Sequence, residues 1–341
     1  MSKMRHGMAI YRRAYKKKIS TSVQKNQTQL PSLSPYPLQN NNLTISDIAI
    51  FDQISSKWLI VNNKTILPSQ IVTLKLNEIL VINDCVTFIN NGIINIDAGS
   101  IIINSGIINN NLKIINNGII DNIKCGIIIN IQILNNNGGI INNSNDCIID
   151  NINGIINNIN CGIINNFGII TNDNLIFNIN NSIINNNGFN GIINNNGEFD
   201  NYCGIINNIN GGVFNNTQSI DNTKSNLYNS YGTINNIKYS IFNNNTTCVI
   251  NNTNGLIKNI NYGLIYNNGE IDNINGIIQI GNCESLKCIG TIYNMDNGII
   301  IGNYPLNHNI ININNIDTYS DDQLLIWSNA DNNTCSCPLN F

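Results

Sequence analysis

One short motif, GIINN, recurs through the middle of the chain and restricts the possible folds more than any other feature. It stands complete at Gly106–Asn110, Gly154–Asn158 and Gly204–Asn208. Between Asn90 and Gln279, pairs of Ile-like residues follow one another in steps of mostly six to eight residues, which average close to seven. The order eight, six, seven occurs twice, so three steps span 21 residues.

A repeat of seven residues is too short to contain a helix, and its composition favours strands and turns. Of the 341 residues, 80 are Asn and 74 are Ile. Ile is β-branched and favours strands, whereas Asn and Gly favour turns and positive φ. Each unit therefore predicts a short strand followed by a turn. Stacked coils of about 21 residues and three short strands each predict an all-β, single-stranded parallel β-helix (β-solenoid) with irregular end caps.

Substitutions between units indicate which member of each Ile pair faces the core. The first position also accepts Glu198 and Thr233, whereas the second stays apolar, as at Phe199 and Ile234. Neighbouring strand residues face opposite sides, so we expect the second position inside and the first outside. A further Ile in the longer units is expected to fill the core beside a corner: Ile152, Ile159, Ile209, Ile260 and Ile274.

Two consequences concern the surface and the turns. Most first positions are still Ile, which predicts lanes of exposed Ile that a partner or a second copy would cover. A nucleotide bias that favours Ile codons is the alternative explanation. Asn recurs at equivalent positions, which we assign to turns, and stacking would align these amides in hydrogen-bonded ladders along the coil axis.

The chain divides into four segments by composition and register. Residues 1–46 are a basic, extended N-terminal arm and linker, and residues 47–90 are an N-terminal cap with the first coils. Residues 91–282 form the regular β-helix, and residues 283–341, where the repeat register is lost, form a C-terminal cap. Such ends are expected because a solenoid must cover its core and block edge pairing.

Charge is distributed unevenly between the arm and the remainder of the chain. The chain has 17 Lys and Arg and 20 Asp and Glu, for a net charge of −3. Residues 1–46 contain eight of the basic residues and no acid, which leaves nine basic and 20 acidic residues elsewhere. This pattern indicates a tail that binds an anionic partner, such as nucleic acid or an acidic protein, or else a solvated terminus. The basic residues of the arm are Lys3, Arg5, Arg12, Arg13, Lys16, Lys17, Lys18 and Lys25.

Six of the ten cysteines follow the repeat. We expect these to pack as small residues and not to form a disulfide framework. Three stand directly before the Gly of a unit: Cys125, Cys161 and Cys203. Three stand where that Gly would be: Cys85, Cys147 and Cys248.

The other four cysteines lie outside the regular array, in the spacings C-x4-C and C-x-C. They are Cys283, Cys288, Cys335 and Cys337. Reduced thiols or one disulfide at the C-terminal end are the main interpretations, and a zinc site is the weaker alternative. We expect no cofactor.

No run of apolar residues is long enough for a transmembrane segment. The basic start lacks the apolar stretch of a secretory signal.

The GIINN array resembles the Asn/Ile-rich repeat proteins of mimivirus-like giant DNA viruses. The stretch ILPSQIVTLKLNEILVINDCVTFINNGIIN also resembles the solenoid starts of surface proteins with GTITNNGTI repeats. The resemblance covers roughly residues 60–280 and implies a parallel β-helix with a structural or surface role in the virion. It does not include the basic arm. We accordingly expect a virion location for a viral protein and a cytoplasmic one otherwise.

Candidate catalytic residues are few. Parallel β-helices often act on polysaccharides, and pectate-lyase-like sites resemble clusters of Asp with Arg, Lys or His. Asp200 and Asp221 are 21 residues apart, which predicts adjacent coils about 5 Å apart. Such a pair could raise one pKa or bind Ca²⁺, or it could be two exposed carboxylates on one face. No His or Arg lies between Asn90 and Gln279.

These features predict a non-enzymatic structural virion protein, a rigid β-helical minor capsid or surface component anchored by its basic arm. Its partners would be other capsid or virion proteins, or a second copy that covers the Ile lanes. The alternative is a glycan-binding or glycan-cleaving, pectate-lyase-like β-helix protein.

Overall fold

The structure is a computed structural model that divides into two units, residues 1–39 and 40–341. It describes the backbone of residues 41–223 and of the later strands given below. Side chains are described through residue 220 and at Leu227, Asn229, Thr233, Ile234, Ile250 and Ile257. The eight basic residues of the predicted arm lie outside the described residues.

The described strands form three sheets of 12, 14 and 12 strands, named sheets A, B and C. Sheet A contains β1 (Asn41–Leu43), β5 (Gln70–Leu74), β8 (Ile93–Ile96), β11 (Lys113–Asn116), β14 (Ile133–Asn137), β17 (Ile155–Ile159), β20 (Leu175–Ile179), β23 (Glu198–Tyr202), β26 (Ser219–Thr223), β29 (Ile241–Asn244), β32 (Leu264–Asn267) and β35 (Leu286–Cys288). Sheet B contains β2 (Ile50–Asp52), β3 (Lys57–Ile60), β6 (Ile79–Ile82), β9 (Ile101–Asn104), β12 (Ile119–Asn122), β15 (Ile140–Asn143), β18 (Ile163–Asn166), β21 (Ile183–Asn187), β24 (Ile205–Ile209), β27 (Asn226–Ser230), β30 (Val249–Thr253), β33 (Glu270–Ile274), β36 (Thr291–Met295) and β38 (Asn309–Ile313). Sheet C contains β4 (Lys64–Ile66), β7 (Thr87–Asn90), β10 (Ile107–Asn110), β13 (Ile127–Asn130), β16 (Ile148–Asn151), β19 (Ile169–Asn172), β22 (Ile192–Asn195), β25 (Val213–Asn216), β28 (Thr233–Ile237), β31 (Leu256–Ile260), β34 (Ile277–Ile280) and β37 (Ile299–Ile301).

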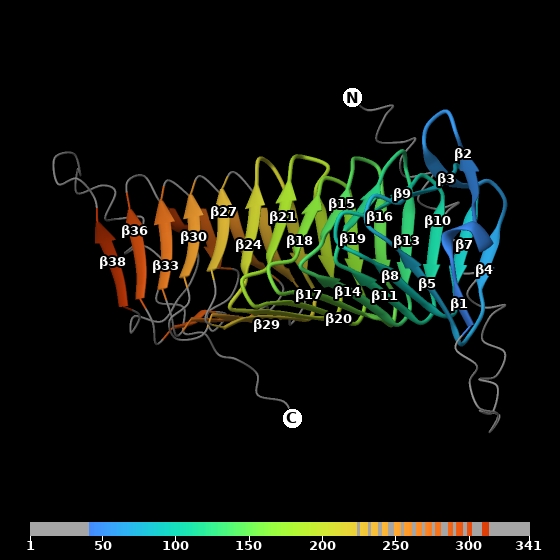
Figure 1. Cartoon of the computed structure of the whole chain (residues 1–341). Coiled ribbons are helices and arrows are strands. Elements are labelled where there is room, and N and C mark those ends of the chain that lie inside the picture. The colour runs from blue at the N-terminus through green and yellow to red at the C-terminus, as the bar shows by residue number, and fades with distance from the viewer. Residues whose placement is uncertain are drawn as a thin grey trace, which may run out of the picture. The chain divides into compact units, whose positions relative to one another are not determined.

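From β3 onward, consecutive strands belong to different sheets, and each strand pairs in parallel with the strand three places later in the chain, until the last coil. The neighbouring strands of sheet B therefore stand side by side in Figure 1. From β5 onward, equivalent residues of successive coils are 18 to 23 positions apart. The predicted parallel β-helix, with three short strands and about 21 residues per coil, is confirmed.

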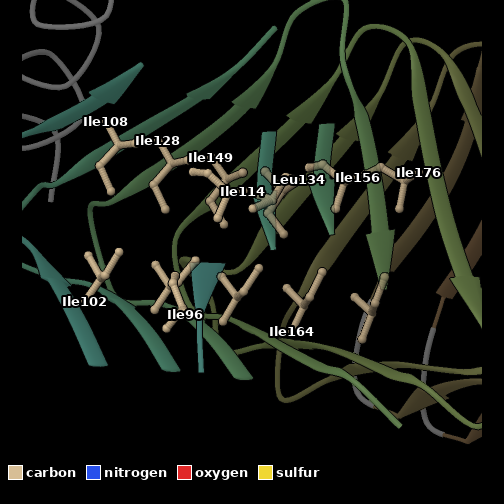
Figure 2. Packing of buried hydrophobic residues seen from close by; sticks show 14 of the residues in the cluster. Ile96, Ile102, Ile108, Ile114, Ile128, Leu134, Ile149, Ile156, Ile164 and Ile176 are labelled. Atoms are coloured by element: carbon tan, nitrogen blue, oxygen red, sulfur yellow. The ribbon is translucent and has the colours of Figure 1, made fainter. Parts of the chain in front are cut away.

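The predicted core position is also confirmed. In β10, Ile107 is half-buried and Ile108 is buried, and the same alternation recurs in most strands of the described array. Figure 2 shows the buried members of successive coils in rows, for example Ile108, Ile128 and Ile149. Large aliphatic side chains from all three sheets thus fill the space between them.

The outward Ile residues are half-buried, where the sequence predicted exposed lanes. Ile140, for example, lies between its register partners Ile119 and Ile163. Coils only about 4.8 Å apart let identical side chains cover one another above and below. The lanes exist, but each Ile presents only part of its surface to solvent.

The fourth strand residue, usually Asn, also faces inward. These Asn side chains have no exposed surface and form three buried ladders, one along each sheet. In sheet B the ladder runs through Asn104, Asn122, Asn143, Asn166, Asn186, Asn208 and Asn229. In sheet C it runs through Asn90, Asn110, Asn130, Asn151, Asn172, Asn195 and Asn216. In sheet A it runs through Asn116, Asn136, Asn158, Asn178 and Asn201.

Each buried amide joins its own coil to the next. The Nδ2 of Asn122 donates to Oδ1 of Asn143 at 2.8 Å and to the main-chain oxygens of Gly126 at 2.8 Å and Ile148 at 3.2 Å. The ladders predicted from the sequence therefore exist. The longest ones lie inside the strand ends, and shorter Asn rows are present at the corners, where Asn111 donates to Asn91 at 2.8 Å and Asn180 donates to Asn160 at 3.4 Å. The parity of the strand explains this position, since the fourth residue faces the same side as the second.

The same parity makes one prediction wrong. Ile159 and Ile209 are the fifth residues of β17 and β24, and they are half-buried on the outside. Asn, not the additional Ile, fills the core beside the corner. Ile152 is likewise half-buried, while the side chains of Ile260 and Ile274 lie outside the described residues.

The ladders begin where the corner residue changes from aliphatic to Asn. Asn104 is the register partner of Ile82, and Asn116 is the register partner of Ile96. No amide precedes either one, and the buried Oδ1 atoms of Asn104 and Asn116 accept no hydrogen bond. The first coils are thus held by apolar packing alone at positions where later coils have amides.

At several corners the closeness of the coils requires glycine before the strand. A Cβ at Gly106 would clash with the main-chain oxygen of Val86, and one at Gly168 would clash with that of Cys147. These oxygens accept the N–H of the strand residue that follows the glycine: Ile107 and Ile169.

The N-terminal end of the stack is closed by a 3₁₀ turn, η1 (Ile45–Asp47), and by the antiparallel pair β2–β3. Ile45 and Ile48 are buried against the core. The Oδ2 of Asp47 accepts hydrogen bonds from the N–H and hydroxyl of Thr44, both at 2.7 Å, and these lower the pKa of its carboxyl. Parallel pairing starts at Asn41, within the predicted arm of residues 1–46. It continues to β38, within the predicted C-terminal cap of residues 283–341.

We predict that Asn143→Ala lowers the free energy of unfolding by about 3 kcal/mol, because buried partners in three successive coils lose a hydrogen bond. The matched control is Asn142→Ala, the outward neighbour, which bonds to Asp121 and Asn165 at the surface. Its expected cost is below about 1 kcal/mol because water can replace it. Urea unfolding measures both, and equal costs would contradict a stabilising role for the buried ladder.

Candidate functional site

The outward face of sheet B, between β6 and β24, is the most uniform surface in the described part of the chain. We call it face B. Its first positions form an aliphatic row: Ile79, Ile101, Ile119, Ile140, Ile163, Ile183 and Ile205. Its third positions are Val81, Ile103, Asp121, Asn142, Asn165, Asn185 and Asn207. Asp121 is the one charged residue at the outward positions of these seven strands.

The third positions of face B form an outer amide row with a defined direction. Asn142 donates to Oδ1 of Asp121 at 2.7 Å, Asn165 donates to Asn142 at 2.8 Å, and Asn185 and Asn207 continue the row. A carboxylate only accepts, so Asp121 must be the accepting end. The buried ladder of sheet B donates the opposite way, because its amides also donate to main-chain oxygens of the following coil, such as that of Ile148.

Two aromatic side chains extend the apolar surface at the corner that follows sheet B. Phe167 follows β18 and is 40% exposed, and Phe189 follows β21, one coil later, and is 88% exposed. The ring of Phe189 lies where a Cβ of Gly211 would be, so the glycine of the next coil makes room for it. Face B therefore combines a row of Ile, a row of amides and two exposed rings.

The structure pairs Asp200 with Asp221 in the backbone register of β23 and β26. Asp200 is half-buried, between the exposed side chains of Glu198 and Tyr202 on the same strand. Its other register partner is Phe177 of β20. The side chain of Asp221 lies outside the described residues, so the geometry of a carboxylate pair is not defined.

Within the described residues, no group of three or more His, Cys, Asp or Glu side chains is placed to hold a metal ion. The four cysteines of the predicted zinc site are not among these described side chains. Cys288 ends β35, but its side chain is not described, and Cys283, Cys335 and Cys337 lie outside the described residues, as does Cys248.

The repeat-phased cysteines are free thiols in two different environments. Cys147 is buried, as predicted, but Cys85, Cys125 and Cys161 are exposed, and Cys203 is half-buried. The last four have φ between 53° and 64°, which places them at corner tips with their side chains turned from the core. The prediction that all six pack as small residues is therefore wrong.

Cys85 also stands one position earlier than predicted. Val86, not Cys85, occupies the place of the glycine, because the N–H of Ile107 donates to its main-chain oxygen. The corner before β7 is longer than the two-residue corner before β10. Aligning the units by sequence alone therefore placed Cys85 at the position of the glycine.

In the part of the chain that the structure describes, no helix has the length and apolar character needed to cross a membrane.

Comparisons with known proteins identify no family. No protein-family model matches the chain, and no curated protein sequence matches it. Among solved structures, the chain is similar to a crystal structure of a hyper-glycosylated TibA fragment whose glycosylation is catalysed by TibC. The sequence identity is 13%, the TM-score is 0.33, and the match covers 80% of this chain and 98% of that chain. A likeness at this level carries no functional argument.

Proposed function

We propose that this protein is a non-enzymatic structural component of a virion, in which the β-helix serves as a rigid element of the particle. The basic arm would bind an anionic partner, and face B would contact neighbouring capsid proteins. The observation that carries this proposal is the structure of face B: a regular, almost uncharged surface supported from inside by the buried amide ladders.

The internal construction of the coils supports a rigid element. The main chain pairs in parallel from coil to coil, and three rows of buried amides repeat those connections at the corners. The internal space is lined by aliphatic and aromatic side chains such as Leu134, Ile141 and Phe199. Interior groups of this kind contribute to stacking and offer no polar group to a substrate.

The composition of face B supports a contact surface. Depletion of charge and enrichment in apolar and aromatic side chains are typical of the centre of protein interfaces. Face B has one carboxylate, Asp121, which already accepts a hydrogen bond from Asn142. Its neighbour, the outward side of sheet A, includes the charged residues Lys113 and Glu198. Face B is thus better suited than the outward side of sheet A to lose its water.

The charge split supports the anionic partner. The arm has eight basic residues and no acid, on a chain whose remainder has 20 acids. A cationic segment attached to an acidic body binds anionic surfaces by releasing counterions, and such binding weakens as salt increases.

We predict that quantitative mass spectrometry of purified particles finds this protein at the copy number of a structural component. The particles should be treated with protease before lysis, to remove adhering proteins. Absence from the purified particles, or a trace amount typical of a packaged enzyme, would contradict the proposal.

We predict that Ile163→Lys on face B prevents incorporation into the particle, because a charge would have to be buried at the contact. Ile155→Lys is the matched control, since it changes the first outward residue of the preceding strand, on sheet A. Thermal unfolding of both variants controls for stability, which should change by similar, small amounts. Equal incorporation of the two variants would exclude face B as the contact.

Glycan binding is the second candidate function, and one observation favours it. On β23 the outward residues are Glu198, Asp200 and Tyr202 in turn, of which Glu198 and Tyr202 are exposed, and Phe177 of the adjacent strand is the register partner of Asp200. Aromatic faces and carboxylates are groups that can bind the apolar face and the hydroxyls of a sugar. A cleaving activity would further require the Asp200–Asp221 pair to act together.

For this second function we predict that glycan-array binding is lost in Tyr202→Ala and that reducing-sugar release, if present, is lost in Asp200→Asn. Phe189→Ala, on a different corner, is the control and should leave both unchanged. No array signal with the wild-type protein would reject the glycan hypothesis.

A further inference from the structure

Two cysteines occupy the same corner of successive coils. Cys125 lies in the corner between β12 and β13, and Cys147 lies in the corner between β15 and β16. Ile127 and Ile148 are register partners, and the N–H of Ile148 donates to the main-chain oxygen of Gly126 at 3.1 Å. Cys147 therefore lies beside Gly126 of the preceding coil, and Cys125 is its diagonal neighbour.

This placement satisfies the distance requirement of a disulfide. Successive coils are about 4.8 Å apart and successive Cα atoms about 3.8 Å, so the Cα atoms of Cys125 and Cys147 are separated by roughly 6 Å. Disulfides join Cα atoms that are about 4.4 to 6.8 Å apart.

The sulfur of Cys147 lies close to the other cysteine. The main-chain N–H groups of Gly126 and Cys125 are near enough to lower the pKa of its thiol, against the larger effect of burial. The sulfur is thus near the preceding coil, next to the residue that carries the second thiol. Burial raises the pKa of the Cys147 thiol, which keeps it protonated and unreactive toward solvent.

Cys125 has the complementary environment. Its side chain is exposed, and its φ of 62° places it at the tip of the corner. A dissolved oxidant can reach this sulfur but not that of Cys147, which is buried.

The other described cysteines have no such neighbour. Cys161 and Cys203 share a corner but are two coils apart, with Asn181 between them, since the N–H of Asn181 donates to the main-chain oxygen of Cys203. Two coils correspond to about 10 Å, which is beyond the reach of a disulfide. Cys85 and Cys125 are likewise two coils apart, with Ser105 between them.

We propose that Cys125 and Cys147 are a thiol modification site that closes into an intrachain disulfide when the protein meets a small disulfide oxidant. The Cys125 thiolate attacks the oxidant and forms a mixed disulfide, which releases one small thiol. The Cys147 thiol then loses its proton and attacks Sγ of Cys125, which releases the second small thiol. Two protein thiols are oxidised, and one oxidant disulfide is reduced to two thiols.

The bond would tie two successive coils at one corner. It joins residues 22 positions apart in coils that are already in register. The exposed side chain of Cys125 has to turn toward the buried Cys147, so the corner and not the strands must adjust. This inference does not depend on the proposed virion role or on face B.

The experiment uses the full-length protein, treated with oxidised glutathione and then blocked with an alkylating reagent. A protease that cleaves before Asp separates the relevant thiols, because Asp121, Asp146 and Asp150 bound the two peptides. Peptide 121–145 contains Cys125, and peptide 146–149 contains Cys147. We expect unreduced mass spectrometry to show these two peptides joined, with loss of two hydrogen atoms.

Two variants should keep the fold and separate the formation of the mixed disulfide from the attack by Cys147. Ser stands naturally at the position of Cys147 in other corners, at Ser100 and Ser182, so Cys147→Ser should fold. It should leave Cys125 as a stable mixed disulfide with glutathione. Asn occupies the position of Cys125 in another corner, at Asn181 with φ 60°, and Cys125→Asn should leave Cys147 unmodified.

The internal controls are Cys161 and Cys203, which should form only mixed disulfides. A wild-type protein in which Cys125 stays as a mixed disulfide, or links to any cysteine other than Cys147, would overturn the proposal. Urea unfolding of the oxidised wild type should move to higher urea than that of the reduced protein, and the shift should be absent in both variants.

Discussion

The stacking of identical residues at the spacing of adjacent β-strands is the constraint on which the rest of the structure depends. An unpaired amide in an apolar interior costs several kcal/mol, and this interior contains rows of them. They are stable because each Nδ2 finds an Oδ1 of the next coil within 2.7 to 2.9 Å. A buried Asn therefore needs an Asn in a neighbouring coil, and this requirement keeps the sequence repetitive.

The direction of the ladders follows from groups that can only accept. Main-chain oxygens of the following coil orient the inner amides, and Asp121 orients the outer row of face B. A second carboxylate does the same on another corner, where Thr217 donates to Asn196 and Asn196 donates to Asp173. Inner and outer rows donate in opposite directions, so their dipoles partly cancel.

The surface reflects the same repetition. Stacking in register places equivalent residues of successive coils in one continuous row. Face B therefore results from one strand pattern that repeats from coil to coil. Side chains that could bind or react occur where the pattern is interrupted. They are the acidic and aromatic residues of β23, the exposed Phe189, and the neighbouring thiols of Cys125 and Cys147. Except for the buried Cys147, each departure from the pattern lies at a position that the core does not constrain, either outward on a strand or at a corner tip.

The repeat period and the apolar second position were sufficient to predict the β-helix, its three strands per coil and its core. They determined these features because β-branched residues at alternate positions have only one way to bury a single face in units this short. Only the tertiary structure decided where the amides lie, since inside and turn positions differ by one residue and both can form ladders. It also decided the exposure of the outward Ile rows and the neighbours of each cysteine, because corner length varies from coil to coil and shifts which residues of successive coils meet.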